Sequence, residues 1–136
     1  DEAKRTFIRV GPVTLGTLLD SERGSDCTCA FHSPGDARKP RSDLLQWADG
    51  EQASMFVNGE LLRLNVETSE PIGHRVGDKR PIALSSPKVT VAGVMTTTWV
   101  CPPDQEECEA VRLRGTVRIT TKKGSAKVPL EGVCGC

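Results

Sequence analysis

The stretch Ala53-Ser54-Met55-Phe56-Val57-Asn58-Gly59-Glu60-Leu61-Leu62-Arg63-Leu64 carries the clearest structural signal in the chain. Two apolar runs flank Asn58-Gly59, a dipeptide that tolerates the positive φ angles of a type I′ turn, so the stretch predicts a two-residue β-hairpin. This turn also sets the register, and the core face of the hairpin follows from it. The predicted pairs are Val57 with Glu60, Met55 with Leu62 and Ala53 with Leu64, with Phe56 and Leu61 paired on the other face.

The C-terminal third adds two long strand patterns, Lys88 to Val100 and Ala110 to Thr121. Apolar residues fall on the odd positions of both strands, and in the first strand they include Met95 and Trp99. If Cys101 and Cys108 were directly opposite each other, odd residues of one strand would face even residues of the other. Because a slip of one residue turns a whole strand over, we expect a one-residue offset or a bulge beside a Cys101–Cys108 disulfide.

The remaining chain predicts shorter elements. Strands are expected over Thr6 to Val10, Val13 to Leu19 and Pro81 to Leu84, and Ser42 to Trp47 fits either one helical turn or a short strand. A last strand, Ala126 to Val133, contains Pro129 and is therefore expected at a sheet edge. The predicted fold is all-β and mainly antiparallel, with about seven or eight strands and little helix. We expect one domain over residues 1–136, built as a disulfide-stapled sandwich or partly open barrel.

Composition narrows the possible partners. Lys plus Arg and Asp plus Glu both number 18, so no general attraction to nucleic acid is expected. No apolar run approaches the roughly 20 residues of a membrane helix, so we expect no transmembrane segment. The chain opens Asp1-Glu2-Ala3 without Met or a signal-peptide core. Either an export leader has been removed or the expressed chain starts there.

Six cysteines indicate an oxidising compartment, either the bacterial periplasm or the extracellular space. Four of them form two Cys-x-Cys pairs, Cys27 with Cys29 and Cys134 with Cys136. Residues i and i+2 of a strand lie roughly 6.6 Å apart, so bonds between the pairs are easier than bonds within them. Antiparallel strands would join Cys27 to Cys136 and Cys29 to Cys134, whereas parallel strands would exchange the partners. Proximity in sequence favours the third bond, Cys101–Cys108.

A thiol-based site is the main alternative to structural disulfides. Two Cys-x-Cys pairs on neighbouring strands would bring four thiolates together, as a soft ion such as Cu(I) or Zn(II) requires. A redox-active disulfide would need an exposed thiol with a lowered pKa. His32 follows Cys29 by three residues and points to the other face of a regular strand, which makes it a poor ligand.

No catalytic constellation is recognisable. The only histidines are His32 and His74, and the chain has no Gly-x-Ser-x-Gly motif, phosphate loop or dinucleotide fingerprint. We therefore expect a non-enzymatic protein without a metal or another cofactor. The best candidate recognition surface is a basic row that projects from one strand face and would suit an acidic partner. Its members are Arg112, Arg114, Arg118 and Lys122.

The segment from Cys27 to Val66 resembles small exported bacterial proteins of uncharacterised function. Those proteins carry a Cys-x-Cys-x-Phe strand, here Cys27-Thr28-Cys29-Ala30-Phe31, followed by a hydrophobic hairpin with a central Gly. The resemblance implies an envelope location and no particular chemistry. The sequence as a whole predicts an exported binding or accessory domain for a protein or cell-envelope component, and the alternative is a thiol-based metal or redox protein.

Overall fold

The predicted hairpin is present with the predicted register. In the computed structural model, β5 (Ala53–Val57) and β6 (Glu60–Val66) pair antiparallel, and every predicted pair from Ala53–Leu64 to Val57–Glu60 is found. Asn58 and Gly59 both have positive φ angles, 50° and 85°, as a type I′ turn requires. The structure describes residues 5–23, 28–35, 42–48, 51–67, 75–105, 107–108 and 110–135.

Strands make up nearly all of the regular structure in these ranges. One short 3₁₀ helix, Asp20–Glu22, follows the second strand. Among the described residues, we find no helix of the length and apolarity needed to cross a membrane. The other strands are β1 (Phe7–Val10), β2 (Val13–Gly16), β3 (Thr28–His32), β4 (Leu45–Ala48), β7 (Lys79–Ser85), β8 (Val89–Val100), β9 (Ala110–Thr121) and β10 (Gly124–Gly135).

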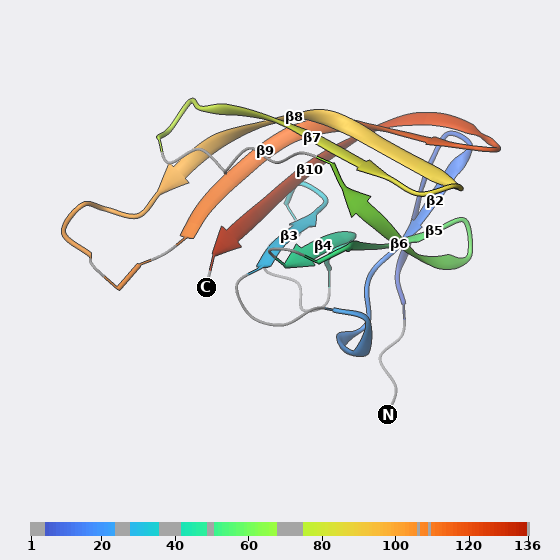
Figure 1. Cartoon of the computed structure of the whole chain (residues 1–136), viewed down its shortest axis with the longest axis horizontal. Coiled ribbons are helices and arrows are strands. Elements are labelled where there is room, and N and C mark those ends of the chain that lie inside the picture. The colour runs from blue at the N-terminus through green and yellow to red at the C-terminus, as the bar shows by residue number, and fades with distance from the viewer. Residues whose placement is uncertain are drawn as a thin grey trace.

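Strands β3 to β10 form a closed antiparallel barrel (Figure 1). Each strand pairs with the next in sequence, and β10 pairs with β3 to close the ring. The β1–β2 hairpin pairs with the Val57 end of β5 through β2, whereas β4 pairs with β5 nearer to Ser54. The all-β antiparallel prediction is confirmed, and the barrel is closed rather than partly open.

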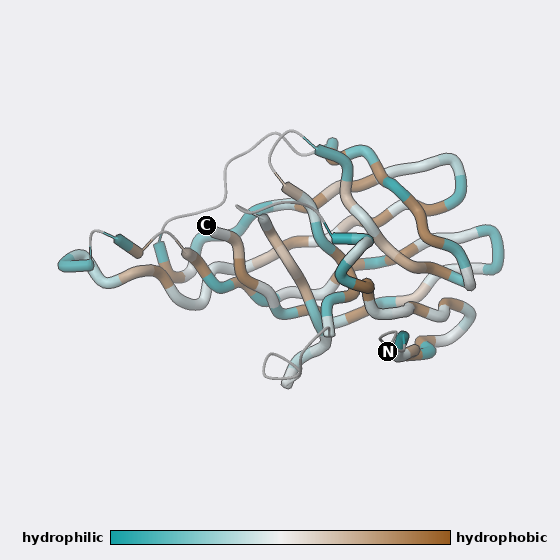
Figure 2. The backbone as a smooth tube through the Cα atoms, turned by 90° about the horizontal axis from the view of Figure 1, so that it is seen from below, coloured by the Kyte–Doolittle hydropathy of each residue, from teal (hydrophilic) through white to brown (hydrophobic). Residues whose placement is uncertain are grey.

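The barrel interior is packed with side chains. Buried and exposed residues alternate along the long strands, and hydrophobic and hydrophilic colours follow one another along the tube in Figure 2. Inward positions are apolar and buried, which gives one continuous core. The largest fully buried side chains include Phe31, Leu45, Met55, Leu64, Leu84, Met95, Leu113, Ile119 and Leu130.

The prediction that the last strand lies at an edge is wrong. Strand β10 pairs with β9 along its whole length and with β3 from Glu131 to Gly135. Pro129 lies outside the part that β3 reaches, so its missing N–H removes no hydrogen bond on that side. A proline is therefore compatible with a barrel strand here because the neighbouring strand β3 is short.

Several other strands begin or end at residues different from those predicted, and their neighbours in the fold explain the difference. The segment Ser42 to Trp47 supplies strand β4 rather than a helical turn. The second strand ends at Gly16, and beyond it Leu18 donates its backbone N–H to the carbonyl of Asp43. Strand β7 is longer than predicted because its Lys79 end pairs with Thr96 on β8.

Candidate binding surface

The structure joins cysteines across the closing seam of the barrel. Cys29 on β3 is opposite Cys134 on β10, and the two form a disulfide between residues 105 apart in sequence. This is the antiparallel alternative. Cys101 and Cys108 form a second disulfide, and no described cysteine is free. Cys27 and Cys136 lie outside the described residues.

The two disulfides determine which cysteines could serve as thiolates in a thiol-based site. A metal site of the predicted kind needs thiolates, and Cys29 and Cys134 are occupied with each other inside the barrel, each 8% exposed. The described part of the chain holds no cluster of three or more His, Cys, Asp or Glu side chains suited to a metal ion. His32 lies on the outward side of β3, paired with Glu131, and its Nδ1 is 2.8 Å from the Ser33 carbonyl oxygen. His74 is outside the described residues.

A bulge interrupts the β8–β9 ladder beside the Cys101–Cys108 disulfide, as predicted. Thr97 pairs with Leu113, but Trp99 pairs with Arg112, so Thr98 is the extra residue. Cys101 consequently lies beside Ala110, whose carbonyl oxygen and nitrogen are both 3.2 Å from its Sγ atom. Up to Thr97 the regular ladder keeps the apolar residues of both strands inside the barrel, and beyond the bulge Val100 pairs with Val111 on that same side.

The bulge also corrects the prediction for Trp99. In an uninterrupted strand, its odd position would place Trp99 on the core face with Met95. Beyond Thr98 the parity changes, and Trp99 lies on the outer face with 38% of its surface exposed. The Arg112 guanidinium carbon is 5.4 Å from the ring centroid of Trp99, within the range of a cation–π contact.

Three of the four predicted surface residues share this outer face. Arg112, Arg114 and Arg118 are exposed on β9. Arg114 pairs with Glu131 at 3.2 Å, and Arg118 donates to the Ser125 hydroxyl at 3.3 Å. These contacts are solvent-exposed, so they orient the side chains at little energetic gain.

Lys122 is placed apart from the arginine row. It belongs to the turn between β9 and β10 and lines a hollow of about 700 Å³ at one end of the barrel. The floor of this hollow includes the buried residues Val57 and Val89, and the ion pair between Lys88 and Glu60 (2.7 Å) lies at its rim. Lys122 is therefore less suited than the arginines to act in one surface with Trp99.

Neighbouring strands extend the arginine row into a larger surface, which we call the basic face. The register places Lys79 of β7 and Lys127 of β10 on the same side as the arginines, although neither lysine is among the residues predicted for this surface. Strand order was the missing information, because neither lysine belongs to an obvious pattern of its own. The basic face comprises Lys79, Val94, Trp99, Arg112, Arg114, Arg118, Lys127, Glu131 and Val133.

Exposed apolar side chains lie among these charges. Val94 and Val133 are 49% and 42% exposed, and Val133 is directly opposite Arg112. Figure 1 shows the β8–β9 hairpin extending beyond the other strands at the end that carries Trp99 and the disulfide loop. Within that loop, Gln105 donates to the Pro102 carbonyl and Cys108 to the Gln105 carbonyl, so two successive turns are held inside a covalent ring.

Comparison with known proteins adds no family to these observations. No protein-family model matches the chain, and neither the curated proteins nor the solved structures include a significant match.

Proposed function

We propose that this protein is a non-enzymatic binding domain whose basic face docks onto an acidic surface of a partner protein. The observation that carries the proposal is the bulge at Thr98, which turns Trp99 out of the core and places it beside Arg112. Exposing a tryptophan costs hydrophobic stabilisation that burial would otherwise supply. Trp and Arg are the side chains most enriched among residues that dominate binding energy at protein interfaces.

Charge supports an acidic partner. The basic face carries five cationic side chains and one carboxylate, Glu131, although the whole chain is neutral. The rest of the chain therefore has four more acidic than basic residues. Such a separation of charge orients the domain toward a negative surface and speeds association, with an effect that salt weakens.

The disulfides support a site of action in an oxidising compartment. Structural disulfides persist in oxidising compartments, and here one of them joins the first and last strands of the barrel. We therefore place the domain in the periplasm or the extracellular space, where the partner is a secreted or envelope protein.

Photo-crosslinking in the source organism tests the proposal. A photoreactive amino acid replaces Val94 or Val133 on the basic face, and Arg9, exposed on β1, serves as the control position. We expect the two valine positions to yield a crosslinked protein with an acidic surface and the Arg9 position to yield none. Crosslinks from Arg9 alone, or none at either valine position, would refute the basic face as the docking surface.

Variants then establish which residues bind. Trp99→Ala and the pair Arg114→Glu with Arg118→Glu should each reduce affinity for the captured partner by about tenfold or more. The charge reversals should also lessen the salt dependence of binding. Arg9→Glu makes a matched charge reversal outside the basic face and should leave affinity unchanged. Equal binding by all variants would contradict the proposal.

A further inference from the structure

The barrel wall has a gap at the end where the β5–β6, β7–β8 and β9–β10 turns lie together (Figure 1). Only residues 65–66 of β6 pair with β7, so among the described residues 60–64 have no strand beside them on that side. Across the gap, the Lys88 Nζ atom lies 2.7 and 2.8 Å from the two carboxylate oxygens of Glu60. A pair of side chains therefore stands where a continuous barrel wall would have a ladder of backbone hydrogen bonds.

Leu62 shows the consequence of this gap. It belongs to the inward row of its hairpin, where Met55 lies opposite and Leu64 two residues further on. These two neighbours are 1% and 0% exposed, whereas Leu62 is only partly buried although it packs against the same core. Covering an inward leucine releases hydrophobic free energy, so an apolar group bound in the gap would be favourable.

The hollow at this gap has a volume of about 700 Å³, and we call it the barrel mouth. Its floor is apolar, and hydroxyl and lysine side chains surround that floor. Both the volume and the position at the end of a β-barrel are typical of small-molecule sites. The residues that define the barrel mouth are Val57, Leu62, Ser86, Val89, Lys122 and Lys123.

Hydrogen bonds hold two of the turns around the barrel mouth. The Asn58 N–H donates to the Thr14 carbonyl at 2.8 Å, and the Asn58 Oδ1 atom accepts the Thr14 N–H at 2.9 Å. In the β7–β8 turn, the Ser86 N–H donates to the Val89 carbonyl at 2.9 Å. The site is therefore largely formed before a ligand binds, which reduces the entropic cost of binding.

The rim of the barrel mouth is positively charged. Lys88 is paired with Glu60, but Lys122 and Lys123 are exposed and form no ion pair within the part of the chain that the structure describes. Both lysines belong to the β9–β10 turn, which borders the apolar floor. An anionic group bound there would lie beside the apolar surface around Leu62.

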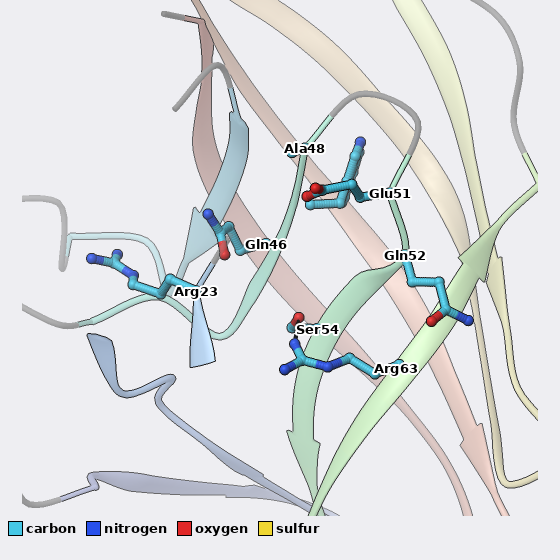
Figure 3. A pocket seen from close by; sticks show the side chains of 8 residues that line it. Arg23, Gln46, Ala48, Glu51, Gln52, Ser54 and Arg63 are labelled. Carbon is cyan, nitrogen blue, oxygen red and sulfur yellow. Dashed lines mark hydrogen bonds between the residues drawn. The ribbon is translucent and has the colours of Figure 1, made fainter. Parts of the chain in front are cut away.

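A smaller hollow, of about 280 Å³ on the outer wall at β4–β6, offers no comparable arrangement (Figure 3). Glu51 and Arg63 are exposed there, and Arg63 already bonds to the Ser54 hydroxyl. Gln46 also has a partner. These polar groups are satisfied by the protein or by water, so they require no ligand.

We propose that the barrel mouth binds a free fatty acid of medium chain length. Its carboxylate lies against Lys122 and Lys123, whose ammonium groups form charge-assisted hydrogen bonds with such oxygens. Its chain lies in the gap and covers Val57, Leu62 and Val89. A neutral chain would leave the lysines without a counter-charge, and a short carboxylate would leave the floor exposed. The ligand therefore needs both parts.

Titration with octanoate tests the proposal, followed by calorimetry and by NMR of the methyl groups. We expect saturable binding with a dissociation constant in the millimolar range or below, and shifts of the Leu62 and Val89 methyl signals. Octanol has the chain without the charge and acetate the charge without the chain, so each should bind at least about tenfold more weakly. The proposal fails if octanoate does not saturate, if octanol or acetate binds equally well, or if the shifts occur at Val133 on the basic face instead.

Variants of the lysines separate the two parts of the ligand. Lys122→Gln with Lys123→Gln should lower octanoate affinity by about fivefold or more and leave octanol binding unchanged, whereas arginine at both positions should retain octanoate affinity. Arg75→Gln removes an exposed cation near the opposite end of β8 and should change nothing. Octanoate affinity that is unchanged in the folded double glutamine variant would overturn the carboxylate site.

A variant of the floor tests the chain. Leu62→Gln places a polar group at a partly exposed position and should weaken octanoate and octanol binding alike, and thermal melting verifies that the protein is folded. Equal affinity of this folded variant and the parent protein for octanoate would refute the apolar floor as the chain site. Both sets of variants leave the basic face intact, so their results are independent of whether that face binds a partner protein.

Discussion

Cys29 and Cys134 are direct cross-strand partners at the one place where the barrel closes between its first and last strands. The link spans 105 residues in sequence, and nearly the whole meander lies between its ends. In the chain-entropy model, closing about 100 residues is worth about 4.7 kcal/mol, whereas closing the Cys101–Cys108 loop is worth about 2.5 kcal/mol.

Removing the seam disulfide should therefore cost more stability than removing the loop disulfide. The comparison is made with Cys27 and Cys136 both replaced by serine, so that no other cross-link between the chain ends contributes. In that background, adding Cys29→Ser with Cys134→Ser should lower the free energy of unfolding by about 2 kcal/mol more than adding Cys101→Ser with Cys108→Ser. Urea denaturation measures both. If the two double substitutions cost the same stability, or if losing the Cys101–Cys108 bond costs more, loop entropy does not determine the contribution of the Cys29–Cys134 bond.

A glycine completes the same seam. Gly132 on β10 is opposite Phe31 on β3, and a Cβ atom added there would lie 2.4 Å from both the Ala30 carbonyl oxygen and the Phe31 Cδ1 atom. Gly132→Ala should therefore destabilise the barrel by about 1–3 kcal/mol, because the backbone of β3 or the Phe31 ring must move.

The neighbouring exposed position provides the control for Gly132. Val133→Ala changes a side chain that is 42% exposed and should shift stability by less than about 0.5 kcal/mol. Thermal or urea melts of the two variants give the comparison directly. A Gly132→Ala protein as stable as Val133→Ala would mean that β3 does not pack on the glycine as described.

The Arg5–Glu22 pair predicts part of the acid sensitivity. The hydrogen bonds from Arg5 hold the pKa of Glu22 below its ordinary value of 4.5, against the opposing effect of burial. A carboxyl whose pKa is depressed by folding stabilises the protein above its unfolded pKa, and this contribution disappears as the pH falls through the folded pKa.

Glu22→Gln should accordingly lose about 1.5–3 kcal/mol of stability at pH 7, the range for hydrogen bonds to charged groups. The difference between wild type and variant should shrink as the pH falls below 4.5. Urea melts at several pH values test this, with Glu60→Gln at an exposed ion pair as the control. A difference that is independent of pH would contradict a lowered pKa for Glu22.

Sequence reasoning succeeded where the signal is local. Asn58-Gly59 determines the turn and the register of its hairpin, and the parity conflict around Cys101 and Cys108 required a bulge. Prediction from the sequence failed where a strand pairs with another strand that is distant in the chain. Pro129 indicated an edge because nothing in the sequence shows that β3, about 100 residues earlier, pairs with β10 only beyond it.

The basic face shows the same limit. The alternation of the two strands predicts a bulge but not its position, and the odd position of Trp99 alone predicts a core residue.

The bulge itself can be removed by one deletion. Thr98 is the extra residue between the pairs Thr97–Leu113 and Trp99–Arg112. Deleting it leaves Trp99 opposite Arg112 and Val100 opposite Val111 in an uninterrupted ladder, with every inward residue still inward. This variant should therefore fold, with a stability within about 1–2 kcal/mol of the parent protein.

Deletion of Val94 is the matched control. Val94 lies within the regular part of the same ladder. Without it, each residue between this position and the bulge changes sides, and Met95 turns from the core to the outer face. We expect that variant to be strongly destabilised or unfolded. In a Trp47→Phe background, acrylamide should quench Trp99 emission readily in both the parent and the Thr98 deletion, because the ring stays on the surface. A shielded Trp99 in the parent protein, or a Thr98 deletion that unfolds while the Val94 deletion folds, would contradict Thr98 as the extra residue of this ladder.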